Sequence, residues 1–166
     1  PVIAVGAMDW SFRPAYYTDY GPWVDIAAPG GDRYSGKTTR TASDGRTVFY
    51  SNAQILSTIL CDDAIAYQDG RKDGGMYGYG FMQGTSMACP HVSGVAALGL
   101  AYAAQNGKKY TPSEFKALLL SSVYGIDDYF MGSKRGDGVI VPDLSVYKNK
   151  MGGGCIDALK LLLAIK

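Results

Sequence analysis

Residues 84–94 read Gly-Thr-Ser-Met-Ala-Cys-Pro-His-Val-Ser-Gly, and small or apolar residues continue from there to Gln105. From Ser86 to about Gln105 these residues occur on all sides of a helical wheel, which predicts a central α-helix that is buried on every side. Pro90 is tolerated in such a helix only near its first turn, because proline lacks a backbone N–H. The helix is therefore expected to begin close to Ser86 and to end at the Asn-Gly pair that follows Gln105.

The place of Ser86 at a helix N-terminus allows two interpretations. The first is a cap, since Ser and Thr commonly accept the unpaired N–H groups there, and Thr85 or Ser86 would serve. The second is a nucleophile, which needs a base, a group that orients the base, and N–H donors for the developing oxyanion. The backbone N–H of Ser86, at the positive end of the helix, is such a donor.

His91 is the one histidine of the chain and lies in the same block. It follows Ser86 by five positions, which turns its side chain by roughly 140° around the helix axis. The ring would therefore not face the serine hydroxyl. His91 is predicted to pack within the helix rather than to act as the base.

The residues before the block favour an α/β fold with a parallel sheet. Residues 2–8 form a continuous apolar run, typical of a strand that is buried on both faces, and residues 21–30 contain a second short apolar strand between turn residues. Because natural chains rarely start within a strand, the sequence is expected to be a piece of a longer one.

The stretch between these strands and the serine block is less regular. Residues 47–50 and 53–60 flank Ser51-Asn52, which predicts a β-hairpin. Residues 30–46 are interpreted as a surface loop whose charges are solvated. The glycines within 68–80 allow backbone conformations that are closed to most residues.

Two further helices are predicted after the serine block. Residues 111–114, Thr-Pro-Ser-Glu, form a capping box that opens an amphipathic surface helix. The Gly-, Asp- and Lys-rich stretch 124–150 contains one short strand, Val139–Val141. Residues 156–165 are expected to form the last helix.

The pattern G-T-S-M-A-x-P-H-V-x-G at 84–94 closely resembles the nucleophile block of subtilisin-like serine proteases, the subtilases of peptidase family S8. Residues 1–7 and 20–30 resemble two strands of that family, and 152–158 resemble its closing G-x-G-x-[IV]-[DN]-A turn. The resemblance implies a three-layer α/β fold with parallel strands, a buried central helix carrying the serine, and a β-hairpin.

The same resemblance implies a function and a site. Ser86 would be the nucleophile of a serine endopeptidase that hydrolyses peptides or proteins through an acyl-enzyme, and its backbone N–H would belong to the oxyanion hole. Four residues beside it would lie close to the substrate: Gln83, Gly84, Thr85 and Met87. For Met87, a position in the core is an equally good interpretation.

In the family the chain order is Asp, His, oxyanion-hole Asn and then Ser, so three of these four would precede Pro1. Residues 1–166 would be the C-terminal portion of one catalytic domain, without its N-terminal portion. Alone it is expected to be inactive, and to self-associate through apolar surface that the missing portion would cover. The resemblance also implies export, to the extracellular space or cell envelope.

There are three alternatives, of which the sequence disfavours the first two. An α/β-hydrolase elbow needs glycine two residues after the serine, where this chain has Ala88, and a histidine far downstream. Serine-carboxyl peptidases lack the M-A-x-P-H-V continuation. A pseudoprotease or interaction module would keep a subtilase fold without the chemistry.

Composition and charge bear on the number of domains and on two classes of partner, nucleic acids and membranes. The chain has 166 residues, 47% of them hydrophobic, and a net charge of +1, which fits one domain and gives no sign of a nucleic-acid partner. The longest apolar run, residues 95–104, is shorter than the roughly 18 residues of a membrane span, so no membrane partner is expected.

No cofactor is expected, and no metal site is convincing, although calcium is conceivable in a longer protein. Some subtilases bind a weak cation near the second strand, and Asp25 matches one ligand position there, but Trp23 stands where an acidic residue is common. The three cysteines, Cys61, Cys89 and Cys155, are interpreted as free buried thiols, with one disulfide between two of them as the alternative.

Overall fold

The computed structural model describes residues 2–35, 38–41, 45, 47–50, 53–58 and 79–165. Its centre is a four-stranded sheet in the order β1 (Val5–Met8), β2 (Ile26–Pro29), β10 (Cys155–Ile156) and β7 (Val123–Tyr124). β2 is parallel to both β1 and β10, and β7 is antiparallel to β10. The predicted α/β fold with parallel strands is confirmed. β1 and β2 are shorter than the segments 2–8 and 21–30 in which they were predicted.

Neighbouring residues of β2 contribute to opposite faces of the sheet, as the pleat of a strand requires. Ile26 and Ala28 belong to one buried cluster together with residues of the helices. Ala27 belongs to a second cluster with Met151 and Cys155. Small side chains in these strands let both layers approach the sheet closely.

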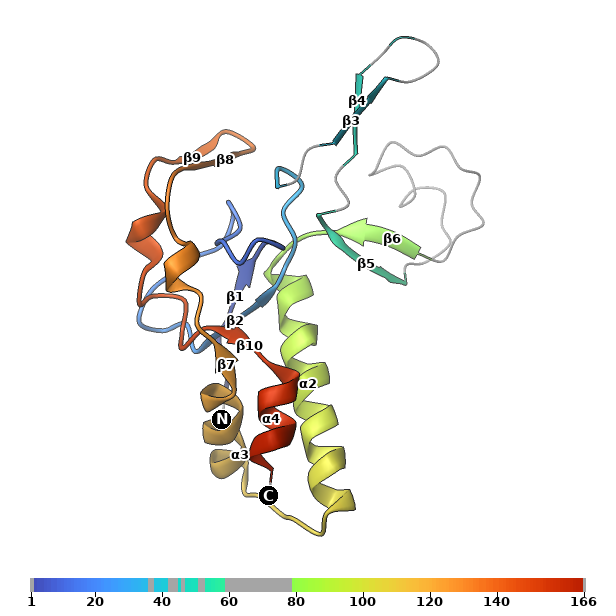
Figure 1. Ribbon diagram of the computed structural model, residues 1–166, viewed down its shortest axis with the longest axis vertical. Helices are drawn as coiled ribbons and strands as arrows, with labels where there is room; N and C mark the ends of the chain where they lie inside the picture. The colour runs from blue at the N-terminus through green and yellow to red at the C-terminus, as the bar shows by residue number, and fades with distance from the viewer. Residues whose placement is uncertain are drawn as a thin grey trace.

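Three helices cover the first face (Figure 1). The long helix α2 (Thr85–Gln105) contacts β1, β2 and the last helix α4 (Ala158–Ala164), and α3 (Pro112–Ser121) contacts α4. The predicted capping box is present, because Thr111 Oγ1 accepts the Glu114 N–H (3.3 Å) and Glu114 accepts the Thr111 N–H (2.7 Å). The last helix is shorter than predicted, since Cys155–Ile156 pairs as β10 and Asp157 caps the helix.

The second face is covered by the chain between β7 and β10. It contains two 3₁₀ helices, η2 (Asp127–Tyr129) and η3 (Leu144–Tyr147), and a two-stranded hairpin of β8 (Lys134–Gly136) and β9 (Val139–Val141). Residues of this stretch form most of the second buried cluster. The predicted strand at Val139–Val141 is confirmed.

The predicted hairpin of residues 47–50 with 53–60 is wrong. β4 (Thr47–Tyr50) pairs with β3 (Thr38–Thr41), which lies inside the segment interpreted as a loop. β5 (Ile55–Thr58) pairs with β6 (Tyr79–Met82), which leads into α2. A short strand pairs with whichever backbone the fold brings alongside, and turn residues alone do not select it. The glycine-rich segment 68–80 lies outside the described residues except for 79 and 80.

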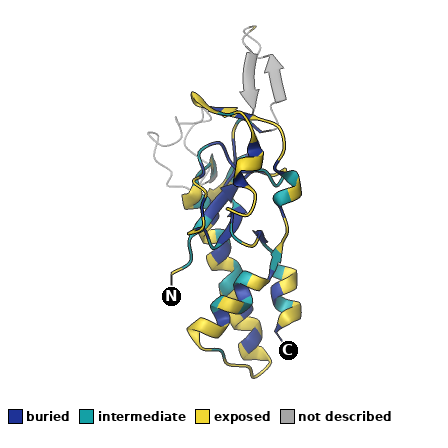
Figure 2. Cartoon of the chain, turned by 90° about the vertical axis from the view of Figure 1, so that its left-hand side faces the viewer, coloured by how far each residue is buried: buried dark blue, intermediate teal, exposed yellow. Residues whose placement is uncertain are grey.

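The helix α2 is buried along one stripe rather than on every side. Its buried residues are Ala88, Val92, Gly99 and Ala103, whose spacings of four, seven and four place them on one side of a helix. Leu98 and Leu100 are 49% and 48% exposed, and Figure 2 shows exposed positions along the helices. The prediction of burial all round is therefore wrong, because among the described residues the buried positions of α2 lie on one side of the helix.

By length and composition alone, α2 is also the one helix of the described residues that is long and apolar enough to cross a membrane. The core helix of a soluble protein has the same properties. In this structure α2 packs on β1, β2 and α4, so it is part of the helix layer that covers one face of the sheet.

The prediction of buried free thiols holds for Cys155 and is wrong for Cys89, which is exposed on α2. Both are free, so no disulfide joins them. Burial raises the pKa of the Cys155 thiol to about 11. Cys61 lies outside the described residues.

Candidate functional site

The start of α2 is formed by Gly84 and not by a side-chain cap. Gly84 is the N-cap residue with φ of 150°, a backbone conformation that favours glycine, and no side chain caps the helix. Its carbonyl accepts the N–H groups of Met87 (3.0 Å) and Ala88 (3.2 Å). The interpretation of Thr85 or Ser86 as a cap is therefore wrong, and both residues are exposed at a helix start whose first N–H groups have no acceptor within the helix.

The end of β2 fixes this helix start. The Gly84 N–H donates to the Gly30 carbonyl (2.9 Å), so the residue after β2 holds the residue before α2. Gly30 must be small, since a Cβ there would lie 2.6 Å from Ala7 Cβ and 2.9 Å from the Gly84 carbonyl oxygen. Ser86 is thus placed at the carboxyl end of β2, beside the sheet edge where parallel strands end.

Tyr17 supports the same turn from the other side. Its hydroxyl donates to the carbonyls of Gly30 (2.9 Å) and Gly31 (2.5 Å). Burial raises the pKa of Tyr17 well above its ordinary value of 10.0, so the hydroxyl remains a donor across the physiological range.

Gln83 is tied to two loops that are distant in sequence. Its Oε1 accepts the Arg33 N–H (2.6 Å), and its Nε2 donates to the Tyr16 hydroxyl (3.0 Å). Tyr16 in turn donates to Asp137, which also accepts bonds from Arg33 and Tyr34. The side chain three residues before Ser86 is therefore held by a network that reaches the β8–β9 hairpin.

This network shifts the pKa of its members. Burial and the bond to Asp137 raise the pKa of Tyr16 to about 12. The bonds from Tyr16, Tyr34 and Arg33 lower the pKa of Asp137 to about 2. At neutral pH the network holds a charged carboxylate and a protonated phenol, which is the combination that its hydrogen bonds require.

A buried ion cluster adjoins this network, because Asp32 of the cluster accepts the N–H of Tyr16. Lys134 Nζ contacts Asp9 Oδ2 (2.7 Å) and Asp32 Oδ2 (3.0 Å) and donates to the Pro14 carbonyl (2.5 Å). All three charged side chains are buried. Burial raises the pKa of Asp9, but the Lys134 charge and hydrogen bonds from Lys134, Ser35 and Arg13 outweigh it, so the pKa lies below 3.8.

The two carboxylates also organise backbone. Asp9 Oδ1 accepts the N–H groups of Ser11 (2.8 Å) and Arg13 (3.1 Å). Asp32 accepts those of Tyr16 (3.1 Å) and Tyr34 (2.8 Å). The cluster therefore fixes the loops that carry Tyr16 and Arg33, the two partners of Gln83.

His91 is engaged within its own helix. Its Nδ1 lies 2.7 Å from the Met87 carbonyl oxygen, one turn earlier. This agrees with the prediction that His91 packs in the helix. Met87 itself is half-buried, and its sulfur lies 3.7 Å from where a Cβ on Gly84 would be.

The residues near β2 do not fit a bound cation. Asp25 Oδ2 is already contacted by Lys116 Nζ (3.2 Å) and by the Ala4 N–H (2.9 Å), and Trp23 is a 65% exposed aromatic. Within the ranges that the structure describes, no group of three His, Cys, Asp or Glu side chains is placed to hold a metal.

Sequence reasoning located the serine block but missed its supports. The residues that position Gln83 and the turn at Gly30 are Tyr16, Tyr17, Arg33, Lys134 and Asp137. Arg33 lies in the loop 30–46, whose charges were interpreted as solvated, and Lys134 is 125 positions from its partner Asp9. The only local signal is a set of charged and tyrosine residues in loops that are otherwise poor in apolar residues.

Comparison with known proteins identifies the family. The model of the subtilase family matches residues 1–144, so the chain belongs to the subtilase family of serine proteases. It is 35% identical over 119 residues to an extracellular basic protease of Dichelobacter nodosus, covering 72% of this chain and 15% of that protein. It is 33% identical over 155 residues to fervidolysin of Fervidobacterium pennivorans, covering 87% and 21%. The chain thus spans only 15% and 21% of the length of these two relatives.

Solved structures share the fold. A lanthipeptide protease has a TM-score of 0.63 at 24% identity, over 99% of this chain and 41% of that one. A protease of Pseudoalteromonas arctica has a TM-score of 0.59 at 25% identity, over 99% and 36%. These likenesses confirm the predicted subtilisin-like α/β fold.

Proposed function

We propose that this chain is the C-terminal portion of a subtilase catalytic domain and supplies Ser86 as the nucleophile of a serine endopeptidase. The observation that carries the proposal is the exposed serine at an uncapped helix start, which Gly84 and Gly30 fix at the end of β2. Membership of the subtilase family supports the same role. The relatives' names, including extracellular proteases, support peptide or protein substrates and export.

Each residue of the site has a part in this proposal. Ser86 Oγ attacks the carbonyl carbon of the scissile peptide and forms an acyl-enzyme, which water then hydrolyses. The Ser86 N–H stabilises the oxyanion. Gln83, Gly84, Thr85 and Met87 line the substrate, and Gly84 leaves space for a close approach of the substrate backbone.

The proton acceptor must come from outside this chain. The one histidine is His91, and its Nδ1 is within hydrogen-bond distance of the Met87 carbonyl. We therefore propose that residues 1–166 alone do not hydrolyse peptides, and that Asp, His and oxyanion-hole Asn residues of the natural full-length protein complete the site. No cofactor is part of the proposal.

A fluorophosphonate probe tests the proposal, because it reacts with an activated serine. Full-length protein should be labelled stoichiometrically at Ser86, as located by peptide mass spectrometry. Ser86→Ala should abolish labelling, whereas Ser93→Ala, an exposed serine on the same helix, should not. The 166-residue chain alone should stay unlabelled.

The outcomes separate the alternatives. Rapid labelling of the isolated chain would contradict its inactivity. A full-length protein that stays unlabelled would instead support the pseudoprotease or interaction module.

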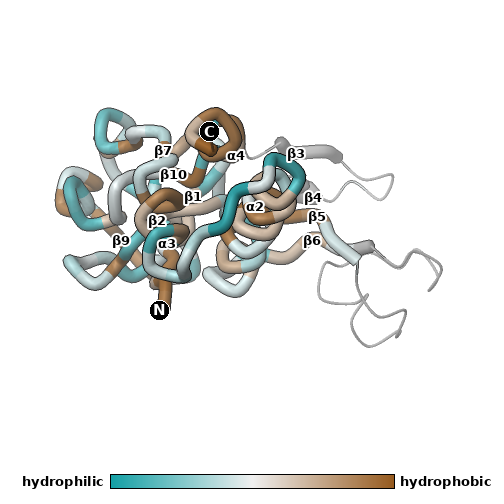
Figure 3. The backbone as a smooth tube through the Cα atoms, turned by 90° about the horizontal axis from the view of Figure 1, so that it is seen from below, coloured by the Kyte–Doolittle hydropathy of each residue, from teal (hydrophilic) through white to brown (hydrophobic). Residues whose placement is uncertain are grey.

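We further propose that the isolated chain self-associates through exposed hydrophobic residues, which include Val2, Leu98, Leu159 and Leu163. Figure 3 shows α4 and the first residues in the colour of high hydropathy. A monomer in sedimentation would contradict this.

A further inference from the structure

Asp25 stands at the junction between the first segment of the chain and β2. Its N–H donates to the Ala4 carbonyl (2.9 Å), and its Oδ2 accepts the Ala4 N–H (2.9 Å). The backbone bond from Ala4, together with Lys116, lowers the pKa of Asp25 below 3.8. The junction therefore carries a fixed negative charge beside two strands.

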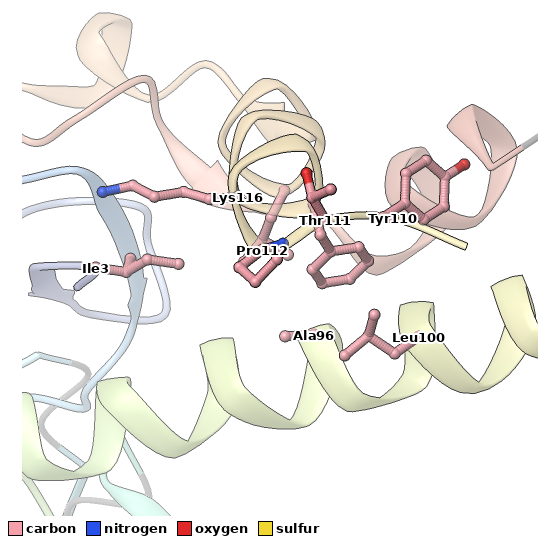
Figure 4. Close-up of a pocket in the computed structure, with 9 residues that line it drawn as sticks. Ile3, Ala96, Leu100, Tyr110, Thr111, Pro112 and Lys116 are labelled. Carbon is pink, nitrogen blue, oxygen red and sulfur yellow. The ribbon is translucent and has the colours of Figure 1, made fainter. Parts of the chain in front are cut away.

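Lys116 reaches this charge from α3. Its Nζ donates to the Val2 carbonyl (2.5 Å) and contacts Asp25 Oδ2 (3.2 Å), so two oxygens from separate segments converge on one positive charge. The side chains of Lys116 and Asp25 are 25% and 30% exposed. Figure 4 shows Lys116 extending from α3 toward the segment that carries Ile3, at the edge of a hollow of about 420 Å³ between α2 and α3.

Carboxylate and backbone carbonyl oxygens are the ligands that hard cations take in proteins. Here an ammonium group, with three N–H donors, already occupies the space between such oxygens. The ammonium group is also covalently part of α3, whereas a bound ion is held only by its ligands and can dissociate. The arrangement therefore connects α3 to the strand junction by the contacts that an ion would otherwise make.

We infer that Lys116 is a tethered cation that takes the place of a bound metal ion between Asp25 and the Val2 carbonyl. The junction of β2, the N-terminal segment and α3 is then stable without a metal. Removing the ammonium leaves the Asp25 carboxylate, which the Ala4 N–H holds in place, and the Val2 carbonyl without a cation between them. Stability there then comes to depend on a dissolved cation.

The test measures thermal unfolding of the natural full-length protein carrying Ser86→Ala, which prevents self-digestion, so the readout does not depend on activity. Lys116→Met should lower the Tm by about 2–4 °C. Millimolar Ca²⁺ or K⁺ should recover part of that loss, beyond the effect of choline chloride at equal ionic strength. Lys109→Met, an exposed lysine before α3, is the matched control and should show neither effect.

Two further variants locate the effect. In Asp25→Asn/Lys116→Met the recovery by cations should vanish, because its carboxylate ligand is gone. Lys116→Arg keeps the charge and should respond to cations no more than the parent does. The inference is overturned if the loss in Lys116→Met is absent, if cations do not recover it, or if the parent gains as much from cations as the variant.

Discussion

The Gly84 N–H donates to the Gly30 carbonyl across 2.9 Å, and this single bond joins the end of β2 to the start of the serine helix. Gly30 and Gly84 are 54 positions apart, and neither position tolerates a larger residue without strain or displacement. The exposed position of Ser86 is therefore set by backbone, and side chains such as Tyr17 and Gln83 hold that backbone in place.

Gly30→Ala should destabilise the protein by about 1–3 kcal/mol, because the new Cβ would lie 2.6 Å from Ala7 Cβ and 2.9 Å from the Gly84 oxygen. The displacement of Gly84 should also slow probe labelling of Ser86 in the full-length protein. Urea unfolding and labelling rates measure the two effects. Gly125→Ala, where no atom lies within 4 Å of the added Cβ, is the control, and equal behaviour of the two variants would contradict the prediction.

Two glycines of α2 should respond to alanine with opposite signs. Gly94→Ala should stabilise the helix by about 0.5–1 kcal/mol, because nothing lies within 4 Å of the added Cβ and alanine has the higher helix propensity. Gly99→Ala should destabilise it by about 1–3 kcal/mol, since its Cβ would lie 2.6 Å from Leu161 Cδ2 and 3.2 Å from Phe115 Cζ. Denaturant unfolding of the two variants side by side measures the difference, and a stabilised Gly99→Ala would show that α4 is not packed on α2 as described.

Lys134→Met should lower the free energy of unfolding by about 3–5 kcal/mol at pH 7, because it removes the ammonium that contacts both buried carboxylates and leaves Asp9 with the longer ionic contact to Arg13 (3.8 Å). Arg135→Met, on the same strand but exposed, should cost little. A loss of equal size in both variants would mean that the hairpin, rather than the buried charge, is responsible.

The same cluster predicts a pH dependence. The pKa of Asp9 is lower in the folded protein than its ordinary value of 3.8. Its contribution to stability is therefore fully present above 3.8 and is lost as the pH falls from there through the lower pKa of the folded state. In Lys134→Met the two largest causes of the lowering are gone, so burial, the largest cause overall, raises the pKa of Asp9 relative to the parent. Acidification from pH 7 to pH 5 should therefore recover part of the variant's loss, as unfolding at each pH would show; a variant that only weakens further would contradict this.

His91→Ala should leave probe labelling of Ser86 in the full-length protein within about threefold of the parent, because the ring contacts the Met87 carbonyl and takes no proton from the serine. A base, in contrast, contributes orders of magnitude to the rate. Loss of labelling on that scale in correctly folded His91→Ala would identify His91 as the base.

The elements predicted correctly are those with local signals. The capping box at Thr111 fixes the start of α3 through residues four positions apart or fewer, and the continuous apolar runs of β1 and β2 indicate strands buried on both faces. The block around Ser86 predicted the helix start to within one residue.

The features that were missed depend on contacts between distant residues. The partner of β4 is β3, a choice that the turn residues beside it do not encode. The exposure of Leu98 and Leu100 depends on what packs against α2, and the helical wheel records only what could be buried. In the sequence, nothing distinguishes three charged residues from ordinary surface charges, although the fold brings them into contact: Asp9, Asp32 and Lys134.

The buried cluster also limits how this protein can be re-engineered. Asp9 and Asp32 belong to loops near the sheet edge, whereas Lys134 lies on the β8–β9 hairpin. Lys134 contacts both carboxylates, and Arg13 adds a longer contact to Asp9 (3.8 Å). A chimera that exchanges the hairpin alone with a relative lacking this lysine would leave both carboxylates without this counter-ion in the interior. The hairpin and the two loops are therefore transferable only as one unit.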